Sequence, residues 1–236
     1  MIAKPSFLIA ALAVSMLVSA TGVSDAADAK AKAKAKAKRD PAFDAVTDDP
    51  KLPRVLLIGD SISIGYTVPV RNLLKDKANV HRIAENGGPT TNGLGKLQKW
   101  VAVGKWDVIH FNWGLHDLKF MGDGTRQVPI DAYEKNLREL VKQLKATGAK
   151  LVWCSTTPVP DAKMSPPRKN EDVIAYNVVA KKIMEENGIA IDDLYSYTLP
   201  KLVDVQRPAN VHYTDPGYEF LAKQVADSIQ AVLSKK

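Results

Sequence analysis

Residues 54–65 read Arg54-Val-Leu-Leu-Ile-Gly-Asp-Ser-Ile-Ser-Ile-Gly65, and this stretch sets the architecture of the chain. The four consecutive apolar residues from Val55 to Ile58 predict a strand that is buried on both faces, as in a parallel sheet. A helical pattern follows from about Ile64, so Ser61 lies between a buried strand and a helix. Open α/β sheets bind ligands at this carboxyl edge, where free backbone N–H groups can face a negative charge. Ser61 is therefore a candidate nucleophile, and the alternative is that Asp60 and Ser61 only cap the helix.

Apolar runs and helical patterns alternate along the rest of the chain. After the first strand, the apolar runs predict four more strands, at residues 80–84, 106–112, 149–154 and 189–192. Apolar residues at helical spacing predict helices at residues 68–76, 94–103, 130–147, 172–187 and 217–233. Strands that alternate with helices are joined by parallel crossovers, so the pattern predicts an α/β fold with a five-stranded parallel sheet covered on both faces.

The N-terminal residues 1–27 have the features of a signal peptide. Lys4 precedes an apolar run of about 12 residues, and small residues follow it up to Ala27. An uncleaved membrane anchor is the alternative, but this run is shorter than the roughly 20 residues needed to span a bilayer. The sequence therefore predicts export, to the periplasm or outside the cell, with no transmembrane segment after signal cleavage.

Residues 28–52 are predicted to be a disordered linker, because they begin with a Lys/Ala tract at residues 28–39. This tract carries six basic residues and one acidic residue, whereas the whole chain has a net charge of +7. The tract thus has a net charge of +5, and all other residues of the chain, including the domain that is predicted at residues 53–236, together sum to +2. Like charges at every second residue favour a solvated spacer, and the alternative is a segment that grips an anionic polymer. The sequence contains no nucleic-acid motif, so we expect no nucleic-acid partner.

The sequence predicts no cofactor and no metal site. Histidine, cysteine and carboxylate residues form no cluster with metal-ligand spacing, and the nearest approach to one is His116-Asp117. The glycine motifs that cradle nucleotide phosphates are also absent from the sequence. The one cysteine, Cys154, lies in an apolar segment and is expected to be a small buried side chain.

Four short motifs follow predicted strands or precede the last helix. They are Gly59-Asp60-Ser61-Ile62, Asn86-Gly87-Gly88, Gly114-Leu115-His116-Asp117 and Val211-His212-Tyr213-Thr214. In this order they resemble the first, second, third and fifth sequence blocks of the SGNH (GDSL-type) serine hydrolases, and the resemblance covers about residues 53–232. It implies a flavodoxin-like three-layer α/β/α sandwich, the SGNH hydrolase fold, and hydrolysis of ester bonds through an acyl-enzyme on a serine.

The resemblance implies that Ser61 and His212 form the catalytic pair. A serine hydroxyl is a poor nucleophile at neutral pH and needs a neighbouring base to take its proton. His212 lies just before the last helix, where the family carries that base. The other histidines fit this role less well, because His81 and His110 lie within predicted strands and His116 lies in the third block.

The third member of the triad departs from the family pattern. The family has an aspartate three residues before its histidine, and this chain has Ala209 there. Asn210 cannot supply a charge. The imidazole of His212 therefore needs another acceptor, and three are open: a backbone carbonyl, Asp204 from the preceding loop, or Asp215, which is also placed to cap the last helix.

An oxyanion hole needs donors aimed at the position of the tetrahedral oxygen. The resemblance implies the backbone N–H groups of Ser61 and of Gly87 or Gly88 as two of them. The third donor is an asparagine side chain in the family, and His116 stands in its place. A neutral imidazole can donate one N–H, which would make the hole pH-dependent. Asn112 is the fallback donor.

Two aspartates are expected to fix the loops that carry these groups. Asp60 has this role by resemblance, through hydrogen bonds to backbone amides, and Asp117 is expected to do the same in the third block. His116 has an alternative role, in which it binds Asp117 and only shapes the loop.

The expected substrates are small-molecule or polysaccharide esters, and the exported relatives that share similar blocks favour O-acetyl groups on carbohydrate. Trp113, Tyr66 and Tyr213 lie near the motifs and could stack on sugar rings or belong to the core. A lipid-acting esterase, lysophospholipase or thioesterase is one rival, although residues 118–129 and 158–170 look too polar for an apolar cleft. A carbohydrate-binding module with a decayed triad is a second, and an anchored structural protein that uses the Lys/Ala tract is a third.

Overall fold

The computed structural model describes Met1 and residues 40–235. The predicted signal peptide and the Lys/Ala tract therefore lie outside the described residues. Within the part of the chain that the structure describes, no helix is both long enough and apolar enough to cross a membrane.

The segment before the first strand is part of the folded unit. It begins with the short 3-10 helix η1 (Pro41–Phe43), in which Ala42 is buried. Arg71 donates to the carbonyl of Pro41, and the Asn79 side chain exchanges hydrogen bonds with the backbone of Asp49. The boundary expected after residue 52 thus falls inside the folded unit. The local composition of the sequence gives no sign of these contacts, which is why it did not predict them.

Five parallel strands form one sheet in the order β2-β1-β3-β4-β5. The register places Leu56 of β1 opposite His81 of β2 and Ile109 of β3. This is the flavodoxin-like order, in which the strand order reverses between β1 and β3 and leaves a crevice at their carboxyl ends. The predicted five-stranded parallel sheet is confirmed. The bounds are β1 Arg54–Ile58, β2 Asn79–Arg82, β3 Val108–Phe111, β4 Lys150–Cys154 and β5 Ala190–Asp192.

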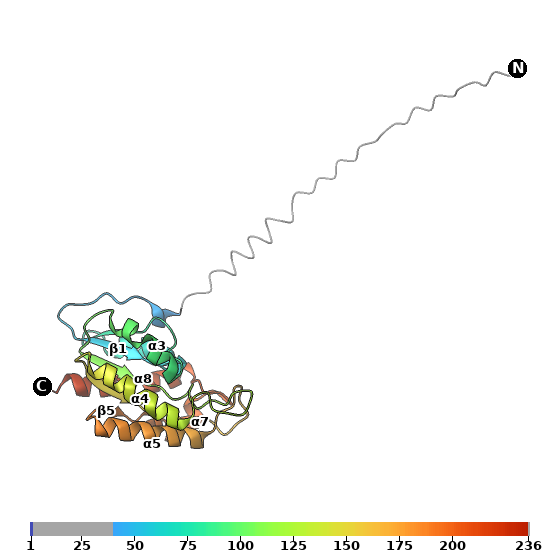
Figure 1. Ribbon diagram of the computed structural model, residues 1–236. Helices are drawn as coiled ribbons and strands as arrows, with labels where there is room; N and C mark the ends of the chain where they lie inside the picture. The colour runs from blue at the N-terminus through green and yellow to red at the C-terminus, as the bar shows by residue number, and fades with distance from the viewer. Residues whose placement is uncertain (2–39, 236) are drawn as a thin grey trace. The chain divides into compact units, whose positions relative to one another are not determined.

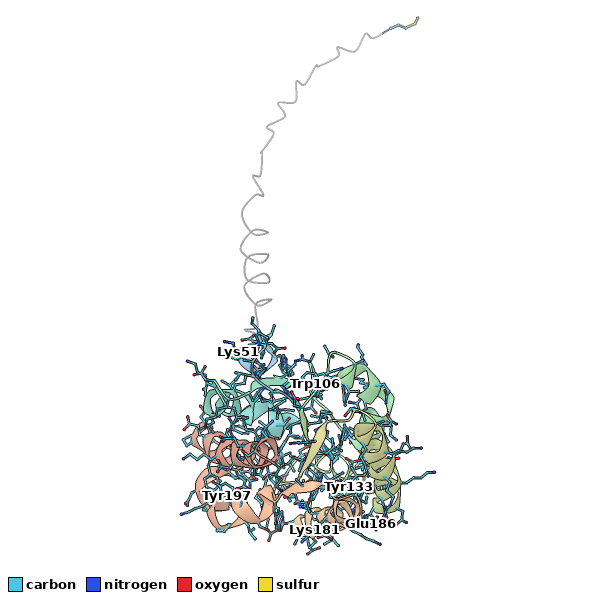
Figure 2. The ribbon with its side chains drawn as sticks, turned by 90° about the vertical axis from the view of Figure 1, so that its left-hand side faces the viewer. Lys51, Trp106, Tyr133, Lys181, Glu186 and Tyr197 are labelled. Atoms are coloured by element: carbon cyan, nitrogen blue, oxygen red, sulfur yellow. The ribbon has the colours of Figure 1, made fainter. Side chains whose placement is uncertain are left out.

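Helices cover both faces of the sheet, which gives the expected three-layer α/β/α sandwich (Figure 1). Helices α2 and α8 pack together on one face, and α3, α4 and α5 pack in succession on the other. Figure 2 shows Tyr197 on the side of α8 and Tyr133, which belongs to α4, on the opposite side. The bounds are α2 Ser61–Leu73, α3 Thr90–Val101, α4 Ile130–Lys145, α5 Asn170–Glu186, α6 Leu194–Thr198, η2 Leu199–Lys201, α7 Leu202–Val205 and α8 Asp215–Leu233.

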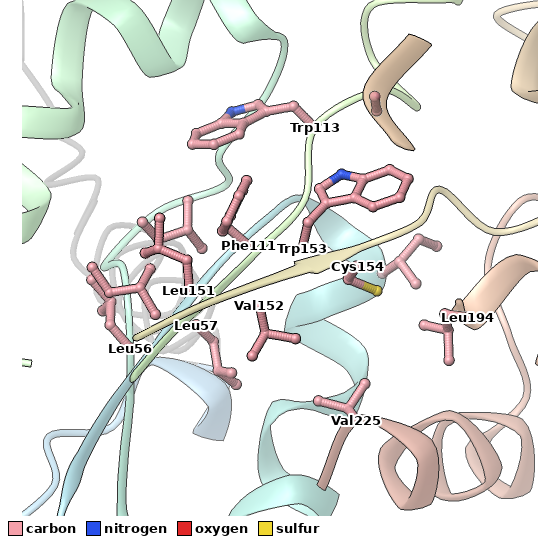
Figure 3. Packing of buried hydrophobic residues seen from close by; sticks show 14 of the residues in the cluster. Leu56, Leu57, Phe111, Trp113, Leu151, Val152, Trp153, Cys154, Leu194 and Val225 are labelled. Carbon is pink, nitrogen blue, oxygen red and sulfur yellow. The ribbon is translucent and has the colours of Figure 1, made fainter. Parts of the chain in front are cut away.

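Alternate residues of the central strands pack into the two halves of the core. In β4, Val152 and Cys154 point toward the side of Val225 in α8, and Trp153 points to the opposite side (Figure 3). All four side chains are almost fully buried. The free thiol of Cys154 is therefore the small core side chain that the sequence predicts.

A buried polar cluster joins β3, β5 and α8. His110 Nε2 lies 2.9 Å from Asp192 Oδ2, and the side chains of Gln224 and Ser228 donate to the same carboxylate. Cys154 lies beside this pair, and one potential ligand atom from each of His110, Cys154 and Asp192 lies within 4.8 Å of the others. The sequence does not predict this grouping, because the residues come from strands far apart in the chain. Since three donors already satisfy the carboxylate, we interpret the cluster as a polar link within the core.

Gly65, the last residue of the stretch 54–65, sets how closely α2 and α8 pack. A Cβ atom at Gly65 of α2 would lie 2.1 Å from the ring of Tyr218 in α8. Only glycine therefore allows this contact without a shift of one helix. Because Ser61 begins α2 and His212 lies just before α8, the same contact brings the two candidate residues to one edge of the sheet.

Candidate active site

Ser61 is the first residue of α2 and follows the carboxyl end of β1. The helix begins here, earlier than the apolar pattern predicts, because the Asp60 side chain caps it by accepting a hydrogen bond from the N–H of Ile62 at 2.9 Å. Of the two residues considered as caps, Asp60 is the one that caps the helix. The N–H of Ser61 is one of the groups that a helix start leaves unpaired, and it has no partner among the described residues. Both the hydroxyl and the N–H of Ser61 are available to a ligand.

His212 meets Ser61 across 151 positions of sequence. Its Nε2 lies 2.8 Å from the Ser61 Oγ. The loop that carries His212 is held by the backbone, since its carbonyl accepts a hydrogen bond from the N–H of Arg207. The buried Gln206 side chain adds a bond to the carbonyl of Pro158. The two residues that the sequence pairs are therefore within hydrogen-bond distance in a loop of defined geometry.

The partner on the other side of the imidazole is Asn210. Its Oδ1 lies 2.8 Å from His212 Nδ1 and also accepts a hydrogen bond from the backbone N–H of His212 at 3.0 Å. Ala209 has a left-handed backbone with φ of 49°, and this turn folds Asn210 back onto His212. Sequence reasoning set Asn210 aside because it carries no charge. Two features of the sequence could have identified it: Asn210 stands two residues before His212, and its side-chain oxygen can accept a hydrogen bond.

The acceptors expected from the sequence do not hold this position. Asp204 lies exposed in the short helix α7, and no hydrogen bond joins it to His212 among the described residues. Asp215 is the first residue of α8, where Thr214 caps the helix by accepting from the N–H of Gly217. An amide oxygen thus replaces the expected carboxylate or backbone carbonyl.

The hydrogen bonds of Asn210 determine the tautomer of His212. The backbone N–H of His212 can only donate, so the amide oxygen of Asn210 must face it. The ring Nδ1 beside that oxygen must then carry the proton, which leaves Nε2 as the acceptor for the Ser61 hydroxyl. This is the arrangement that a general base requires. The amide orients the ring but brings no charge to stabilise an imidazolium.

Burial lowers the pKa of His212 from its usual value. The carboxylate of Asp60 opposes this effect, and the nearby cations Arg207 and Arg168 add to it. The imidazole is therefore in its neutral form at neutral pH, which is the form that accepts a proton.

A cleft of about 370 Å³ opens over this pair. Its polar lining consists of Ser61, Asn86, His116, Ser165, Arg168, Asn210 and His212. Its apolar lining includes Leu115, Met164 and Val211. The segment before α5 contributes Met164 and Arg168 to the wall.

The part of the chain that matches a known protein family includes every residue of this site. The profile of the GDSL-like lipase/acylhydrolase family matches residues 57–220, which include Ser61 and His212. The chain belongs to this family. It is accordingly a carboxylic ester hydrolase. No curated protein matches the chain significantly in sequence.

Solved structures share the fold at low sequence identity. An acetyl xylan esterase, AlAXEase, has a TM-score of 0.64 at 20% identity and covers 75% of this chain and 99% of its own. The lipase/acylhydrolase from Enterococcus faecalis has a TM-score of 0.65 at 22% identity, with 76% and 96% covered. An acetylxylan esterase from Geobacillus stearothermophilus has a TM-score of 0.61 at 19% identity, with 78% and 95% covered. These likenesses show the fold of the GDSL-like family.

The glycine amides that the GDSL-like resemblance implies as oxyanion donors are already bonded within the protein. The N–H of Gly87 donates to the carbonyl of Gly59, and a Cβ atom at Gly87 would lie 2.9 Å from that oxygen. The N–H of Gly88 donates to Asn86 Oδ1 at 2.9 Å. Neither N–H is free to face the cleft in this structure. The expectation of a glycine donor is therefore not met.

Two side chains of the cleft have free donors instead. Because Asn86 Oδ1 accepts from Gly88, the Asn86 amide nitrogen points away from that bond, and it has no hydrogen-bond partner among the described residues. His116 lines the same cleft, and neither of its ring nitrogens is bonded to another described residue. Burial lowers the pKa of His116, so its ring is neutral at neutral pH and donates one N–H. Sequence reasoning found His116 but missed Asn86, although Asn86 stands in the second block.

The remaining predicted residues stabilise the loops. Asn112 donates to the carbonyl of Cys154 at 2.7 Å and to Thr156 Oγ1, so it is not a free donor. The buried carboxylate of Asp117 accepts from the N–H and the hydroxyl of Thr90, which ties the third block to the start of α3. No bond joins His116 to Asp117 among the described residues, so the loop-shaping role considered for His116 has no support here. Burial raises the pKa of Asp117 to about 7.

The aromatic residues near the motifs belong to the core. Trp113, Tyr66 and Tyr213 are each at most 2% exposed. They cannot stack on a sugar in the cleft, so of the two roles considered for them the core role is the one that the structure supports. Their large apolar surfaces pack beneath the site and hold its loops in place.

Proposed function

We propose that this protein is an exported serine esterase that removes O-acetyl groups from carbohydrate, with Ser61 as nucleophile and His212 as base. The observation that carries the proposal is the chain of contacts from Ser61 Oγ to His212 Nε2 and from His212 Nδ1 to Asn210 Oδ1, each 2.8 Å long. The composition of the N-terminal residues supports export.

The reaction proceeds in two halves. His212 Nε2 takes the proton of the Ser61 hydroxyl as the oxygen attacks the ester carbonyl, and the protonated ring then gives this proton to the departing alcohol. Water next attacks the acyl-enzyme, with His212 again as the base, and the acid leaves as Ser61 regains its proton. Asn210 holds the ring in the same orientation throughout.

The tetrahedral oxygen is stabilised by donors that face the cleft. The N–H of Ser61, the amide nitrogen of Asn86 and the ring N–H of His116 serve this role. Ser61 stands at the capped start of α2, and other hydrogen bonds fix the loops that carry Asn86 and His116, so the three donors need no reorganisation when the charge develops.

The acetyl and carbohydrate parts of the proposal are supported by the cleft and by the solved structures that share the fold. The cleft has seven polar side chains among its twelve lining residues, which suits a hydroxyl-rich alcohol better than a long acyl chain. Two of the three structures compared above are described as acetyl xylan esterases. The lipid-acting alternative needs a larger apolar lining.

The proposal is tested with an organophosphonate probe and with acetylated xylan. We expect the full chain to release acetate from the polymer and the probe to label Ser61, as located by mass spectrometry of the labelled peptide. A carbohydrate-binding module with a decayed triad would do neither. A lipid-acting enzyme would be labelled but would prefer long acyl chains, which a series of 4-nitrophenyl esters reveals.

The oxyanion donors give a second expected result. Removal of one such donor typically lowers kcat by about 10²- to 10³-fold, and we expect this loss for His116→Ala on 4-nitrophenyl acetate. Asn86→Asp keeps the acceptor for the N–H of Gly88 but removes the free donor, so we expect a loss of the same order. Steady-state kinetics with KM and kcat determined separately checks both changes.

Matched variants separate donation from simple damage to the loop. His116→Asn places the family's own donor at this position, so most of the rate should return. His81→Asn replaces a histidine of β2 that does not line the cleft, and its kcat should stay within a few-fold of the unmutated protein. An unchanged kcat in His116→Ala would remove His116 from the oxyanion hole.

A further inference from the structure

Arg168 places a guanidinium with no carboxylate partner in the wall of the cleft. Its Nε donates to the carbonyl of Leu115 at 2.9 Å, and its Nη1 donates to the carbonyl of Pro166. No carboxylate forms an ion pair with it among the described residues. Arg126 and Arg138, by contrast, each pair with a carboxylate. The half-buried charge of Arg168 is thus held by neutral oxygens.

The guanidinium is positioned before any ligand arrives. The segment that carries it is closed by a bond from the N–H of Val159 to the Asn170 side chain. The carbonyl of Pro167 also accepts from the N–H of Phe120. Because Leu115 precedes His116, the bond from Arg168 to Leu115 ties the cation to the turn that carries a proposed oxyanion donor.

The charges around the cleft favour an anion. Burial is the largest cause of the lowered pKa of His116 and of His212, and nearby cations add to it: Lys119 and Arg168 at His116, and Arg207 and Arg168 at His212. None of these three cations is in an ion pair among the described residues. The opposing carboxylate is Asp60, which is only 5% exposed and already accepts a bond from the helix. A cleft with this balance attracts negative charge.

We propose that Arg168 binds a carboxylate of the substrate, so that this esterase acts on esters that carry an acidic group. The inference rests on the proposed function, since it names the substrate class of the same site. A guanidinium is planar and matches a carboxylate with parallel N–H groups. Its Nη2 has no partner among the described residues and is free for this contact. The carboxylate belongs either to the alcohol, as in an acetylated uronic acid polymer, or to the acyl group, as in a half-ester of a dicarboxylic acid.

Two pairs of substrates, each differing in charge, test this inference and separate the two sources. Acetylated polygalacturonate is compared with acetylated xylan, and 4-nitrophenyl hydrogen succinate with 4-nitrophenyl butyrate. We expect a higher kcat/KM for the acidic member of one pair, and a loss of about tenfold for that member alone in Arg168→Gln, mainly through KM. The neutral member should change by no more than about twofold, and added salt should weaken the preference.

Two further variants serve as controls for this interpretation. Lys163→Gln removes an exposed charge from the same loop without touching the cleft, so it should keep the preference. Arg168→Lys keeps the charge but loses the planar fork, and an intermediate loss is expected. Equal loss on acidic and neutral members in both Arg168 variants, at an unchanged melting temperature, would overturn the inference, as would a preference for the neutral member in the unmutated protein.

Binding distinguishes failure of this inference from failure of the esterase proposal. Calorimetry with Ser61→Ala and trigalacturonate measures carboxylate binding without turnover, and the added change Arg168→Gln should weaken it about tenfold. Hydrolysis of neutral esters without any acidic preference or binding would leave the esterase and remove the acidic substrate class. Arg168-dependent binding without hydrolysis of any ester would do the reverse.

Discussion

Ser61→Ala and His212→Ala are each expected to lower kcat on an acetyl ester by about 10⁴-fold or more, as for other serine–histidine pairs that act as a unit. The structure gives the reason, since His212 Nε2 is the only described base within hydrogen-bond distance of the Ser61 Oγ. Without the serine there is no acyl-enzyme, and without the imidazole the hydroxyl keeps its proton. Initial rates with 4-nitrophenyl acetate, and acetate release from acetylated xylan, measure both losses.

The double variant, with both Ser61→Ala and His212→Ala, tests this prediction more strictly. Because each residue is useless without the other, the double variant should be about as slow as either single one. Ser63→Ala is the matched control, since its hydroxyl lies two residues away and donates to the carbonyl of Asp60 inside the fold. Activity of Ser61→Ala near that of the unmutated protein would show that hydrolysis uses another group.

Asn210→Ala is expected to lower kcat by about a hundredfold, because the imidazole loses the acceptor that selects its tautomer and orientation. The same kinetic measurements apply, and Asp204→Ala is the control. Asp204 is exposed and not bonded to His212, so its removal should leave the rate within a few-fold. A large loss in Asp204→Ala with none in Asn210→Ala would reverse the assignment made here.

Asn210→Asp carries a pH prediction with a definite sign. In the unmutated protein, burial and the neighbouring cations lower the pKa of His212, so the acid limb of the kcat/KM profile lies below the usual histidine value. A carboxylate at position 210 favours the imidazolium and raises that pKa by about one unit or more, which moves the acid limb to higher pH. The plateau rate should be equal or higher, because a charge now stabilises the imidazolium. A profile that moves to lower pH would contradict this account.

Local pattern was sufficient for the fold. The apolar run from Val55 to Ile58 and its four successors predict a parallel sheet, because a strand buried on both faces has no polar alternation. Ser61 and His212 were also within reach of sequence reasoning, since each stands in a short motif beside a predicted element. The predicted elements differ from the structure mainly at their ends, where caps such as Asp60 and Thr214 set the boundary.

The partners of these residues could not be read from the chain. Asp204 and Asn210 are both near His212 in sequence, and a preference for charge favoured the aspartate. The backbone turn at Ala209 determines which side chain contacts the imidazole of His212. It directs the Asn210 oxygen at that ring, whereas Asp204 is exposed to solvent. The amides of Gly87 and Gly88 are removed as donors for a similar reason, since other groups in their own loops already accept from them.

Sequence alone therefore determines the sheet, its helical cover and the nucleophile with its base, because these depend on periodicity and on short motifs within single elements. Tertiary structure alone selects the orienting amide, the free oxyanion donors and the unpaired cation in the cleft. Each of these depends on which of several nearby groups is already hydrogen-bonded, and that competition is settled only when loops from distant parts of the chain pack at one edge of the sheet.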